Sequence, residues 1–339
     1  MKAVAFTQAG PIDRPQALID LDLPMPQPQA LDLRVQVQAI ALNPVDTKVR
    51  TNRSAASPDN PQVIGWDAVG VVDAVGEQVQ GFKVGDRVFY MGEIGRAGSN
   101  AEYQLVDHRV VGHAPANVAN APLAAMPLTT LTAWELLFER LGVAEGGGLG
   151  QSLLVVGAAG GVGSVLIQLA RQLTQLTIIA TASRPESRAW VKAMGAHHII
   201  SHEEAFWPQL QALGLPQVDY TASLNQTGTH LPAIVAASQV FAKVGFIDDP
   251  KGMDVMTMKT KSMSLHHEFV FARTMHKTPD LHLQGQWLTR VGQMMAAGQI
   301  ISTMTQQLGP INAANVTQAH LLQESGRVRG KLVLEGFAA

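Results

Sequence analysis

The sequence of 339 residues contains no cysteine. This absence excludes disulfide bonds, thiolate nucleophiles and every zinc site that uses thiolate ligands. Histidine offers no clear substitute, because the pairs His197-His198 and His266-His267 lie in strand-like runs, where adjacent side chains point to opposite faces. No histidine pair at i, i+4 lies on an expected helix. We therefore expect no metal site.

Charged side chains are also scarce, at 15% of the sequence, and the formal net charge at pH 7 is −2. No run of lysine or arginine is present, which argues against nucleic acid or an anionic membrane as a main partner. No stretch approaches eighteen consecutive apolar residues, so no membrane-spanning helix is predicted. The first ten residues enter a strand and lack an apolar signal-peptide core. We expect a cytoplasmic protein.

Hydrophobic residues make up 46% of the sequence and follow two patterns. Up to about residue 125 the hydrophobic period is two, as in 31–39, which predicts β-strands. Further strands are expected at 68–75, 87–91 and 101–106. Beyond residue 126 six strands alternate with helices, which predicts an α/β fold with a doubly wound parallel sheet. Those strands are expected at 152–156, 177–182, 197–200, 217–222, 240–247 and 262–269.

The last part of the chain has no place in that six-stranded sheet. Helices are expected near 283–297 and 313–324, followed by a strand at 331–335. We therefore expect this tail to return to the first domain. A chain of 339 residues is also more typical of two domains than of one core. We place one domain at residues 1–125 with 272–339, and the other at 126–271.

The segment VVGAAGGVGS at 155–164 is the most informative part of the sequence. An apolar strand leads into three glycines spaced three apart and then into a helix, which is the context of a dinucleotide-binding turn. Glycine there allows unusual φ values and close approach of the backbone to the pyrophosphate, while N–H groups at the helix N-terminus can bind phosphate. The residues that we assign to this turn are Gly157, Gly160, Gly161, Val162 and Gly163.

The choice of cofactor depends on residues about twenty positions further on. An NAD site has a carboxylate at the tip of the second strand, but this tip is Ser183, followed by Arg184 and Arg188. A hydroxyl and two guanidinium groups suit a 2′-phosphate, so the sequence predicts NADPH rather than NADH. The alternative is that both arginines are solvated surface charges and that Glu186 binds the ribose hydroxyls.

Five segments carry a family resemblance: GWDAVGVVDAVGEQV at 65–79, ALNPVDTKVR at 41–50, PLTTLTAWELLF at 127–138, AAGGVGS at 158–164 and ESGRVRGKLVLEG at 324–336. Together they resemble the medium-chain dehydrogenase/reductase superfamily, in its quinone oxidoreductase branch and the subgroup often labelled zinc-type alcohol dehydrogenase-like protein. Zinc-bearing members use the histidine of a Gly-His-Glu segment as a ligand, where this sequence has Trp66 and Asp67. Asn43 and Asp46 stand in the region that holds a zinc-ligating cysteine in alcohol dehydrogenases.

The resemblance implies a GroES-like catalytic domain, formed by the N-terminal part and the tail, with a Rossmann domain between them. It also implies a homodimer in which the strand expected at 262–269 pairs with its twofold mate, since an open strand edge favours such pairing. The alternative is a covered edge in a monomer. By their places in the family segments, Thr132 and Lys331 are further candidates for binding the cofactor.

The missing zinc ligands bear on the chemistry. Alcohol oxidation without zinc loses the Lewis acid that activates the hydroxyl. A quinone or an α,β-unsaturated carbonyl compound is already electrophilic and can accept hydride with only positioning and hydrogen bonds. The expected function is therefore zinc-independent, NADPH-dependent reduction of such acceptors. Two alternatives stay open: a zinc-dependent alcohol dehydrogenase, and a non-catalytic NADPH-binding sensor or structural protein.

The candidate catalytic and pocket residues are few. Asn43 is expected to hydrogen-bond the substrate carbonyl or the nicotinamide ribose, unless it only caps a loop. Tyr90 is the candidate proton donor or oxyanion partner, and the alternative is a core tyrosine. Asp46 and Asp67 either orient neighbouring groups or are structural. Trp66 and Phe271 are expected to form an apolar wall over a flat substrate. The alternative is that both belong to the hydrophobic core.

Overall fold

The computed structural model describes residues 1–337, which form two compact units. One unit joins Met1–Leu131 to the segment that begins at Phe271, and the other is Thr132–Val270. Within the described residues, none of the helices combines the length and the apolar composition needed to cross a membrane.

The continuous unit is built on a six-stranded sheet in the order β11-β10-β9-β12-β13-β14, and every neighbouring pair is parallel. All residues of β9 are buried, as expected for a strand with helices on both faces. The doubly wound parallel sheet predicted from the sequence is confirmed. Its strands are β9 (Ser152–Val156), β10 (Thr177–Thr181), β11 (His198–Ile200), β12 (Val218–Ser223), β13 (Ser238–Phe246) and β14 (Ser264–His267).

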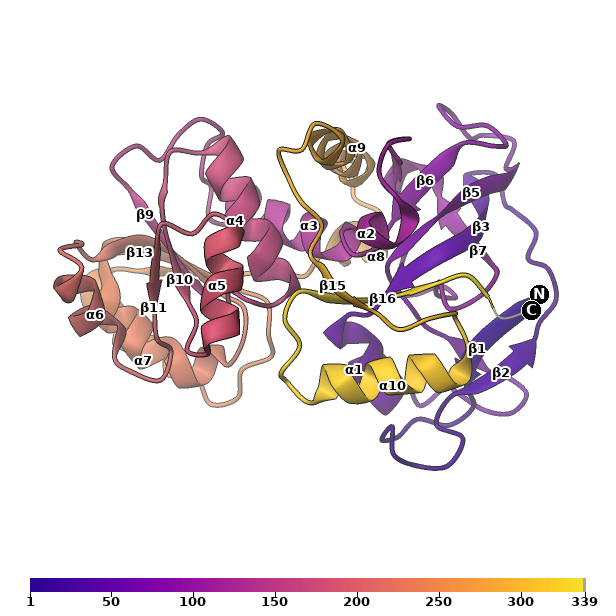
Figure 1. Ribbon diagram of the computed structural model, residues 1–339, viewed down its shortest axis with the longest axis horizontal. Coiled ribbons are helices and arrows are strands. Elements are labelled where there is room, and N and C mark those ends of the chain that lie inside the picture. Colours follow the sequence, from indigo (N-terminus) through magenta and orange to yellow (C-terminus); the bar gives the residue numbers. More distant parts are fainter. Residues whose placement is uncertain (338–339) are drawn as a thin grey trace. The chain divides into compact units, whose positions relative to one another are not determined.

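Helices cover both faces of this sheet. α4 (Gly161–Leu173) and α5 (Pro185–Ala193) lie on one face, and α6 (Phe206–Ala212) and α7 (Thr227–Ala237) lie on the other (Figure 1). This division follows from right-handed crossovers, because the chain steps in one direction from β9 to β11 and in the other from β12 to β14. The direction reverses between β9 and β12, where doubly wound folds bind their ligands.

The edge strand β14 is shorter than the strand predicted at 262–269. The residues before it form a 3-10 helix, η3 (Val255–Lys261), which ends at Ser262 with a φ of 48°. This left-handed conformation is incompatible with a strand. Pairing with β13 therefore starts only at Ser264, opposite Lys243.

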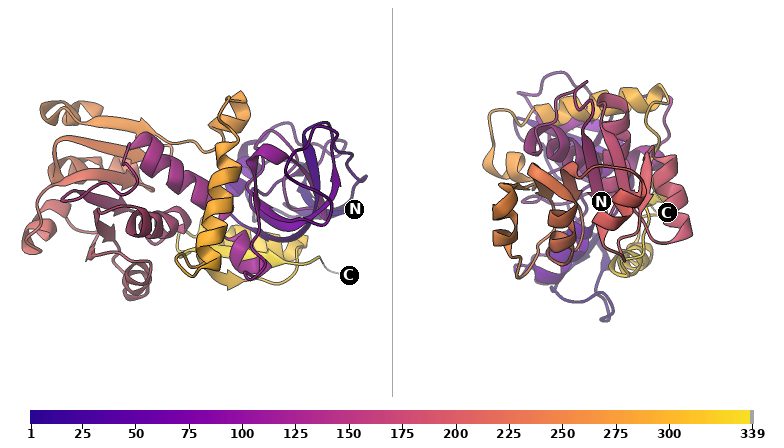
Figure 2. Two further views of the ribbon diagram at one scale, coloured as in Figure 1. Left: turned by 90° about the horizontal axis from the view of Figure 1, so that it is seen from above. Right: turned by 90° about the vertical axis from the view of Figure 1, so that its left-hand side faces the viewer.

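The discontinuous unit contains two sheets. The larger has the order β15-β16-β3-β5-β6-β8, with β7 paired to β3, and the smaller has the order β2-β1-β4. Figure 2 shows the N-terminal strands in indigo and violet, with the C-terminal segment in yellow. The strands are β1 (Lys2–Phe6), β2 (Ile19–Asp22), β3 (Asp32–Ala41), β4 (Gln62–Val63), β5 (Ala68–Val75), β6 (Arg87–Tyr90), β7 (Tyr103–Asp107), β8 (Val111–His113), β15 (Met304–Gln307) and β16 (Lys331–Glu335).

The alternation predicted around β3 is confirmed. Leu33 and Val35 are fully buried, whereas Gln36 is exposed. Asp32 departs from the pattern, because its buried carboxylate accepts hydrogen bonds of 2.8 and 2.9 Å from the guanidinium of Arg96. A charged residue can thus occupy a core position when its partner arrives from another loop.

The C-terminal segment completes the larger sheet. β16 pairs antiparallel with β3, with Val333 opposite Ala41, and β15 lies beside β16. The tail therefore returns to the first part of the chain, as the sequence predicts. Its helices are α8 (Ala272–His276), α9 (Leu283–Ala296), which packs on β8, and α10 (Ala313–Glu324).

Two helices before residue 125, α1 (Pro44–Asn52) and α2 (Asn120–Ala124), are not predicted from the sequence. α1 has Asn43 at its N-cap, proline at its first position and Asp46 in its first turn, which are ordinary start signals. Its buried positions are Asp46 and Arg50, so the helix lacks an apolar stripe that a periodicity search could find. The other helical segments are η1 (His108–Val110), α3 (Pro127–Trp134) and the π-helix η2 (Glu135–Arg140).

Candidate functional site

The glycine turn between β9 and α4 has the geometry of a nucleotide-binding turn. Gly157 has a φ of +76°, a conformation that favours glycine, and its N–H donates to Thr181 Oγ1 at 3.2 Å. A Cβ on Gly163 would lie 2.5 Å from the carbonyl oxygen of Ala158. Glycine at that position therefore allows the helix to pack directly on the end of the strand.

The N-terminus of α4 can receive an anion. The helix begins at Gly161, and no side chain caps it from Gly160. Ser164 Oγ donates to the carbonyl of Gly160 at 2.7 Å and accepts from Trp190 Nε1 at 2.8 Å, which ties the helix start to α5. Gly161 and Val162 are only half-buried. These N–H groups suit the pyrophosphate of a dinucleotide.

The tip of β10 carries the residues predicted to choose the cofactor. Ser183 is half-buried and Arg184, at the N-cap of α5, is exposed. Arg188 donates to the carbonyls of Ala182 at 3.0 Å and Ile199 at 3.3 Å, so it braces the ends of β10 and β11. Its contact with a 2′-phosphate stays a prediction, as do those of Ser183 and Arg184.

His202 is a neighbour of this tip that the sequence prediction does not include. Its Nε2 lies 3.4 Å from Ser183 Oγ. The strand topology explains this contact. His202 follows β11 and Ser183 follows β10, and adjacent parallel strands end at the same edge of the sheet.

A buried polar cluster in the discontinuous unit joins two of the predicted catalytic residues, Asn43 and Asp67, to Lys331. Asn43 Nδ2 donates to Asp67 Oδ2 at 2.7 Å, and Lys331 Nζ donates to the same oxygen at 2.8 Å and to Asn43 Oδ1. The backbone N–H of Leu128 donates to Asp67 Oδ1 at 2.7 Å. None of the three side chains is more than 3% exposed. The amide, carboxylate and ammonium groups therefore hold one another in fixed orientations.

Three segments distant in sequence build this cluster. Asn43 stands at the start of α1, Asp67 directly precedes β5, and Lys331 is the first residue of β16. Pairing of β3 with both β5 and β16 brings the three segments together. The sequence prediction groups Lys331 with the cofactor, whereas the structure directs its ammonium to Asn43 and Asp67. A role of Lys331 toward the cofactor stays a prediction.

Asp46 lies at the edge of the same cluster. Its Oδ2 accepts from the Asn43 N–H at 2.6 Å, while its Oδ1 is buried without a hydrogen-bond partner among the described residues. Burial raises the pKa of Asp46 from 3.8 to about 7, against the opposing effects of the Asn43 N–H and the Lys331 charge. Burial also raises the pKa of Asp67, again opposed by Lys331. Asp46 can therefore hold a proton near neutral pH.

The residues present do not fit a zinc ion. Cysteine is absent, and the region of the expected ligands contains an amide, a carboxylate and the ammonium of Lys331. Within residues 1–337, no group of three or more His, Asp or Glu side chains could hold a metal. The donor set, with a cation already bound to its oxygens, is that of an ion pair and not of a zinc centre.

Tyr90 and the two pocket aromatics are also buried. The Tyr90 hydroxyl has no hydrogen-bond partner among the described residues, and burial raises its pKa. Trp66 donates from Nε1 to the carbonyl of Glu93 at 3.2 Å, and its ring meets Phe271 edge-on at 6.1 Å. The roles of these residues toward a substrate stay predictions, as does the role of Thr132, which is buried in α3.

A second buried charged cluster, in the continuous unit, follows no pattern visible in the sequence. Arg140 Nε donates to Glu268 Oε2 at 2.8 Å, and its Nη2 lies 3.8 Å from Glu135 Oε2. Burial and the charge of Glu135 raise the pKa of Glu268 to about 8. Arg140 opposes this shift, and the three side chains lie where η2 approaches the residue that follows β14.

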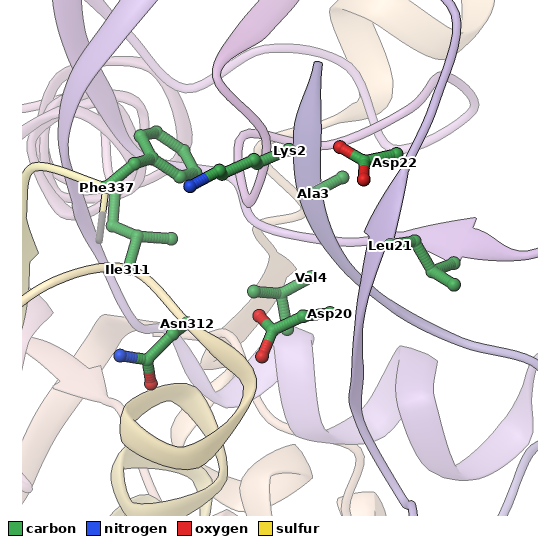
Figure 3. A pocket seen from close by; sticks show the side chains of 9 residues that line it. All are labelled: Lys2, Ala3, Val4, Asp20, Leu21, Asp22, Ile311, Asn312 and Phe337. Carbon is green, nitrogen blue, oxygen red and sulfur yellow. The ribbon is translucent and has the colours of Figure 1, made fainter. Parts of the chain in front are cut away.

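A pocket of about 300 Å³ lies elsewhere in the discontinuous unit, beside β1 and β2 (Figure 3). Its charged residues are Lys2, Asp20 and Asp22. Asp20 Oδ1 already accepts from the N–H of Ala313 at the start of α10, at 2.8 Å. None of the predicted site residues lines this pocket, so it is not the candidate active site.

Comparison with known protein families gives two matches. The alcohol dehydrogenase GroES-like domain matches residues 29–116, and the zinc-binding dehydrogenase domain matches residues 194–334. A zinc-type alcohol dehydrogenase-like protein of Staphylococcus aureus is 37% identical over 302 residues, 87% of this chain and 88% of the relative. The 2-methylene-furan-3-one reductase of Solanum lycopersicum is 30% identical over 305 residues, 87% of this chain and 69% of the relative.

Solved structures agree with these matches. A protein of Rhizobium etli, provisionally described as a zinc-dependent alcohol dehydrogenase, is 46% identical with a TM-score of 0.96, over 100% of this chain and 99% of that one. The quinone oxidoreductase of Coxiella burnetii is 25% identical with a TM-score of 0.80, over 99% of each chain. A mycobacterial protein in complex with NADPH is 25% identical with a TM-score of 0.83, also over 99% of each.

The family resemblance and the two fold types predicted from the sequence, GroES-like and Rossmann, are thereby confirmed. The chain belongs to the medium-chain dehydrogenase/reductase superfamily of nicotinamide-dependent oxidoreductases, in the group of zinc-type alcohol dehydrogenase-like proteins.

Proposed function

We propose that the protein is a zinc-independent, NADPH-dependent reductase of quinones or α,β-unsaturated carbonyl compounds. The observation that carries this proposal is the buried cluster of Asn43, Asp67 and Lys331, in the region where zinc-bearing relatives have their ligands. A site that binds its own ammonium there offers no Lewis acid for alcohol oxidation. An acceptor that is already electrophilic does not need one.

The cofactor assignment rests on the glycine turn and on the tip of β10. Gly157 and Gly163 provide the close approach that a dinucleotide requires, and Ser183 and Arg184 replace the carboxylate typical of an NAD site. When bound, NADPH supplies the hydride. The mycobacterial fold neighbour in complex with NADPH supports this choice.

The acceptor class is supported by two relatives. The tomato enzyme is named a 2-methylene-furan-3-one reductase, and such a compound has a carbon–carbon double bond conjugated to a ring carbonyl. The Coxiella neighbour is named a quinone oxidoreductase. Both acceptors are conjugated carbonyl systems in which added hydride leaves negative charge on an oxygen. A hydrogen-bond donor near that oxygen then lowers the barrier.

Two side chains are our candidates for this donor. The Asn43 amide is held by Asp67 and Lys331, and of its two N–H donors Asp67 uses one, so we assign the other to the substrate oxygen or the nicotinamide ribose. The Tyr90 hydroxyl, buried without a protein partner among the described residues, is assigned to protonate or stabilise the enolate.

A panel of acceptors tests the proposal. Purified protein should oxidise NADPH with a quinone or a 2-alkenal, should be slower with NADH, and should keep its rate after treatment with a chelator. Simple alcohols with NADP should give no reaction. Chelator-sensitive ethanol oxidation would instead establish the zinc-dependent alternative. Tight NADPH binding without turnover of any acceptor would favour the sensor or structural alternative.

We also propose a homodimer through β14. This strand lies at one edge of the six-stranded sheet and pairs with β13 on its inner side. Pairing of two copies would satisfy the N–H and C=O groups on the outer side.

A further inference from the structure

We propose that the ammonium group of Lys331 is a fixed cation that stands in place of a metal ion in this site and keeps divalent metals out of it. The proposal concerns the occupancy of the site and does not depend on which acceptor the protein reduces.

The first argument is the position of the ammonium. Lys331 Nζ lies 2.8 Å from Asp67 Oδ2 and also donates to Asn43 Oδ1, so it bridges two side-chain oxygens that could otherwise ligate a metal. The remaining Asp67 oxygen is bound by the N–H of Leu128. A divalent ion could bind these oxygens only by displacing the ammonium. If both cations contacted the same oxygens in a buried site, they would repel each other strongly.

The second argument is that Lys331 has little freedom to move away. It is 3% exposed and begins β16, where its N–H donates to the carbonyl of Thr303 at 2.9 Å. Asp67 is fully buried, and a buried carboxylate without its partner is strongly destabilising. The ion pair is therefore a permanent part of the fold, unlike a metal, which can be lost to a chelator.

The third argument concerns what remains without the ammonium. Asp67 Oδ2 and Asn43 Oδ1 would lose their shared donor, and Asp46 Oδ1 has no hydrogen-bond partner among the described residues. These are oxygen ligands, the type preferred by hard divalent ions such as Mn²⁺. Removal of the ammonium should convert the ion pair into a weak metal site.

The experiment compares the wild type with Lys331→Ala and Lys331→Arg by melting temperature and by bound metal after dialysis against ZnCl₂ or MnCl₂. The wild type should retain well under one metal per chain and show no change in melting temperature. Lys331→Ala should melt lower than the wild type and regain at least about 2 °C with millimolar Mn²⁺ or Zn²⁺. Lys331→Arg keeps the cation and should respond to neither metal.

Two further variants serve as controls. Lys261→Ala removes a lysine that donates only to backbone carbonyls in the described structure, so metals should not restore its stability. Asp67→Asn combined with Lys331→Met removes both charges, and this neutral pair should fold without any response to metal.

Two results would overturn the proposal. One is stoichiometric metal in the dialysed wild type. The other is a Lys331→Ala variant that neither ion stabilises. If that variant is unfolded after purification, refolding it in MnCl₂ should yield folded protein, and failure to do so also counts against the proposal. Because melting temperature and metal content do not measure catalysis, loss of the proposed reductase function would leave these results unchanged.

Discussion

Tyr90 buries a hydroxyl group that has no hydrogen-bond partner among the described residues. Loss of such a group in Tyr90→Phe removes an unsatisfied polar atom, so the melting temperature should stay the same or rise. If the hydroxyl stabilises the developing enolate, its loss should raise the activation barrier by about 2.7–4 kcal/mol. The value of kcat should then fall by about 100- to 1000-fold, while KM changes little. Steady-state kinetics with an enone, together with thermal unfolding, measure both. Wild-type kcat in the variant would assign Tyr90 to the core alone.

Arg184 and Arg188 should differ in effect, although the sequence predicts the same role for both. Arg184→Ala should weaken NADPH binding at least about tenfold with little change for NADH, because a charge-assisted hydrogen bond is worth about 1.5–3 kcal/mol. Arg188→Ala removes donors to Ala182 and Ile199, so it should also lower the melting temperature. Fluorescence titration with each cofactor measures the first effect. Equal losses for NADPH and NADH in Arg184→Ala would remove Arg184 from the 2′-phosphate site.

The raised pKa of Asp46 predicts that the stability of the protein depends on pH. Burial raises its pKa from 3.8 to about 7, so between these values the folded chain holds a proton that the unfolded chain has lost. The free energy of unfolding should therefore fall as the pH rises from about 4 to about 7, and this contribution should level off above pH 7. Asp46→Asn cannot titrate and still offers an oxygen to the Asn43 N–H.

Urea unfolding at a series of pH values checks this prediction. The stability of Asp46→Asn relative to wild type should increase through the window by an amount on the order of a few kcal/mol. The exposed Asp59→Asn is the matched control and should follow the wild type. Parallel curves for Asp46→Asn and wild type would contradict the shifted pKa.

The sequence predicts which residues belong to the candidate site better than it predicts the contacts between them. The glycine turn is visible because its spacing follows from local backbone geometry. The contact between Lys331 and Asp67 is not visible, since it depends on β16 reaching β3. The same holds for His202 beside Ser183, which depends on two strands being neighbours.

At the scale of the element, α4 depends on close contact with β9. A Cβ on Gly163 would lie 2.5 Å from the Ala158 carbonyl oxygen, and backbone cannot move aside easily. Gly163→Ala should therefore cost about 3 kcal/mol or more, the upper end of over-packing. A Cβ on Gly160 would meet Gly157 at an ordinary 3.5 Å, so Gly160→Ala should cost at most about 1 kcal/mol through the weaker N-cap. Denaturant unfolding of both variants measures the difference, and equal costs would refute the close-packing argument.

Elements with a clear hydrophobic period are the ones that the sequence predicts well. β9 and β5 have the bounds expected, because their apolar residues are continuous or alternating. The sequence does not predict α1, because Asp46 and Arg50 occupy its buried face. The predicted start of β14 is two residues too early, because Ser262 adopts a left-handed conformation that its residue type does not indicate.

At the scale of the whole molecule, the proposed homodimer has two measurable consequences. Light scattering should give twice the mass of one chain over a range of concentrations. Hydrogen exchange should protect successive amides of β14, whereas a strand paired only with β13 would protect alternate ones. A single-chain mass together with alternate protection would support the monomer alternative.

The pairing of Asp67 with Lys331 also has a consequence for biosynthesis. The two residues are 264 positions apart in the sequence, so Asp67 is synthesised long before Lys331. Thr132–Val270 is one continuous segment and can fold as soon as it emerges, whereas the unit that contains Asp67 must wait for β16. Before β16 is synthesised, burial of the unpaired Asp67 carboxylate is unfavourable. We therefore expect the nascent unit to remain incompletely folded until that point. Chaperones that bind incomplete β-sheets would therefore meet this protein through its N-terminal strands.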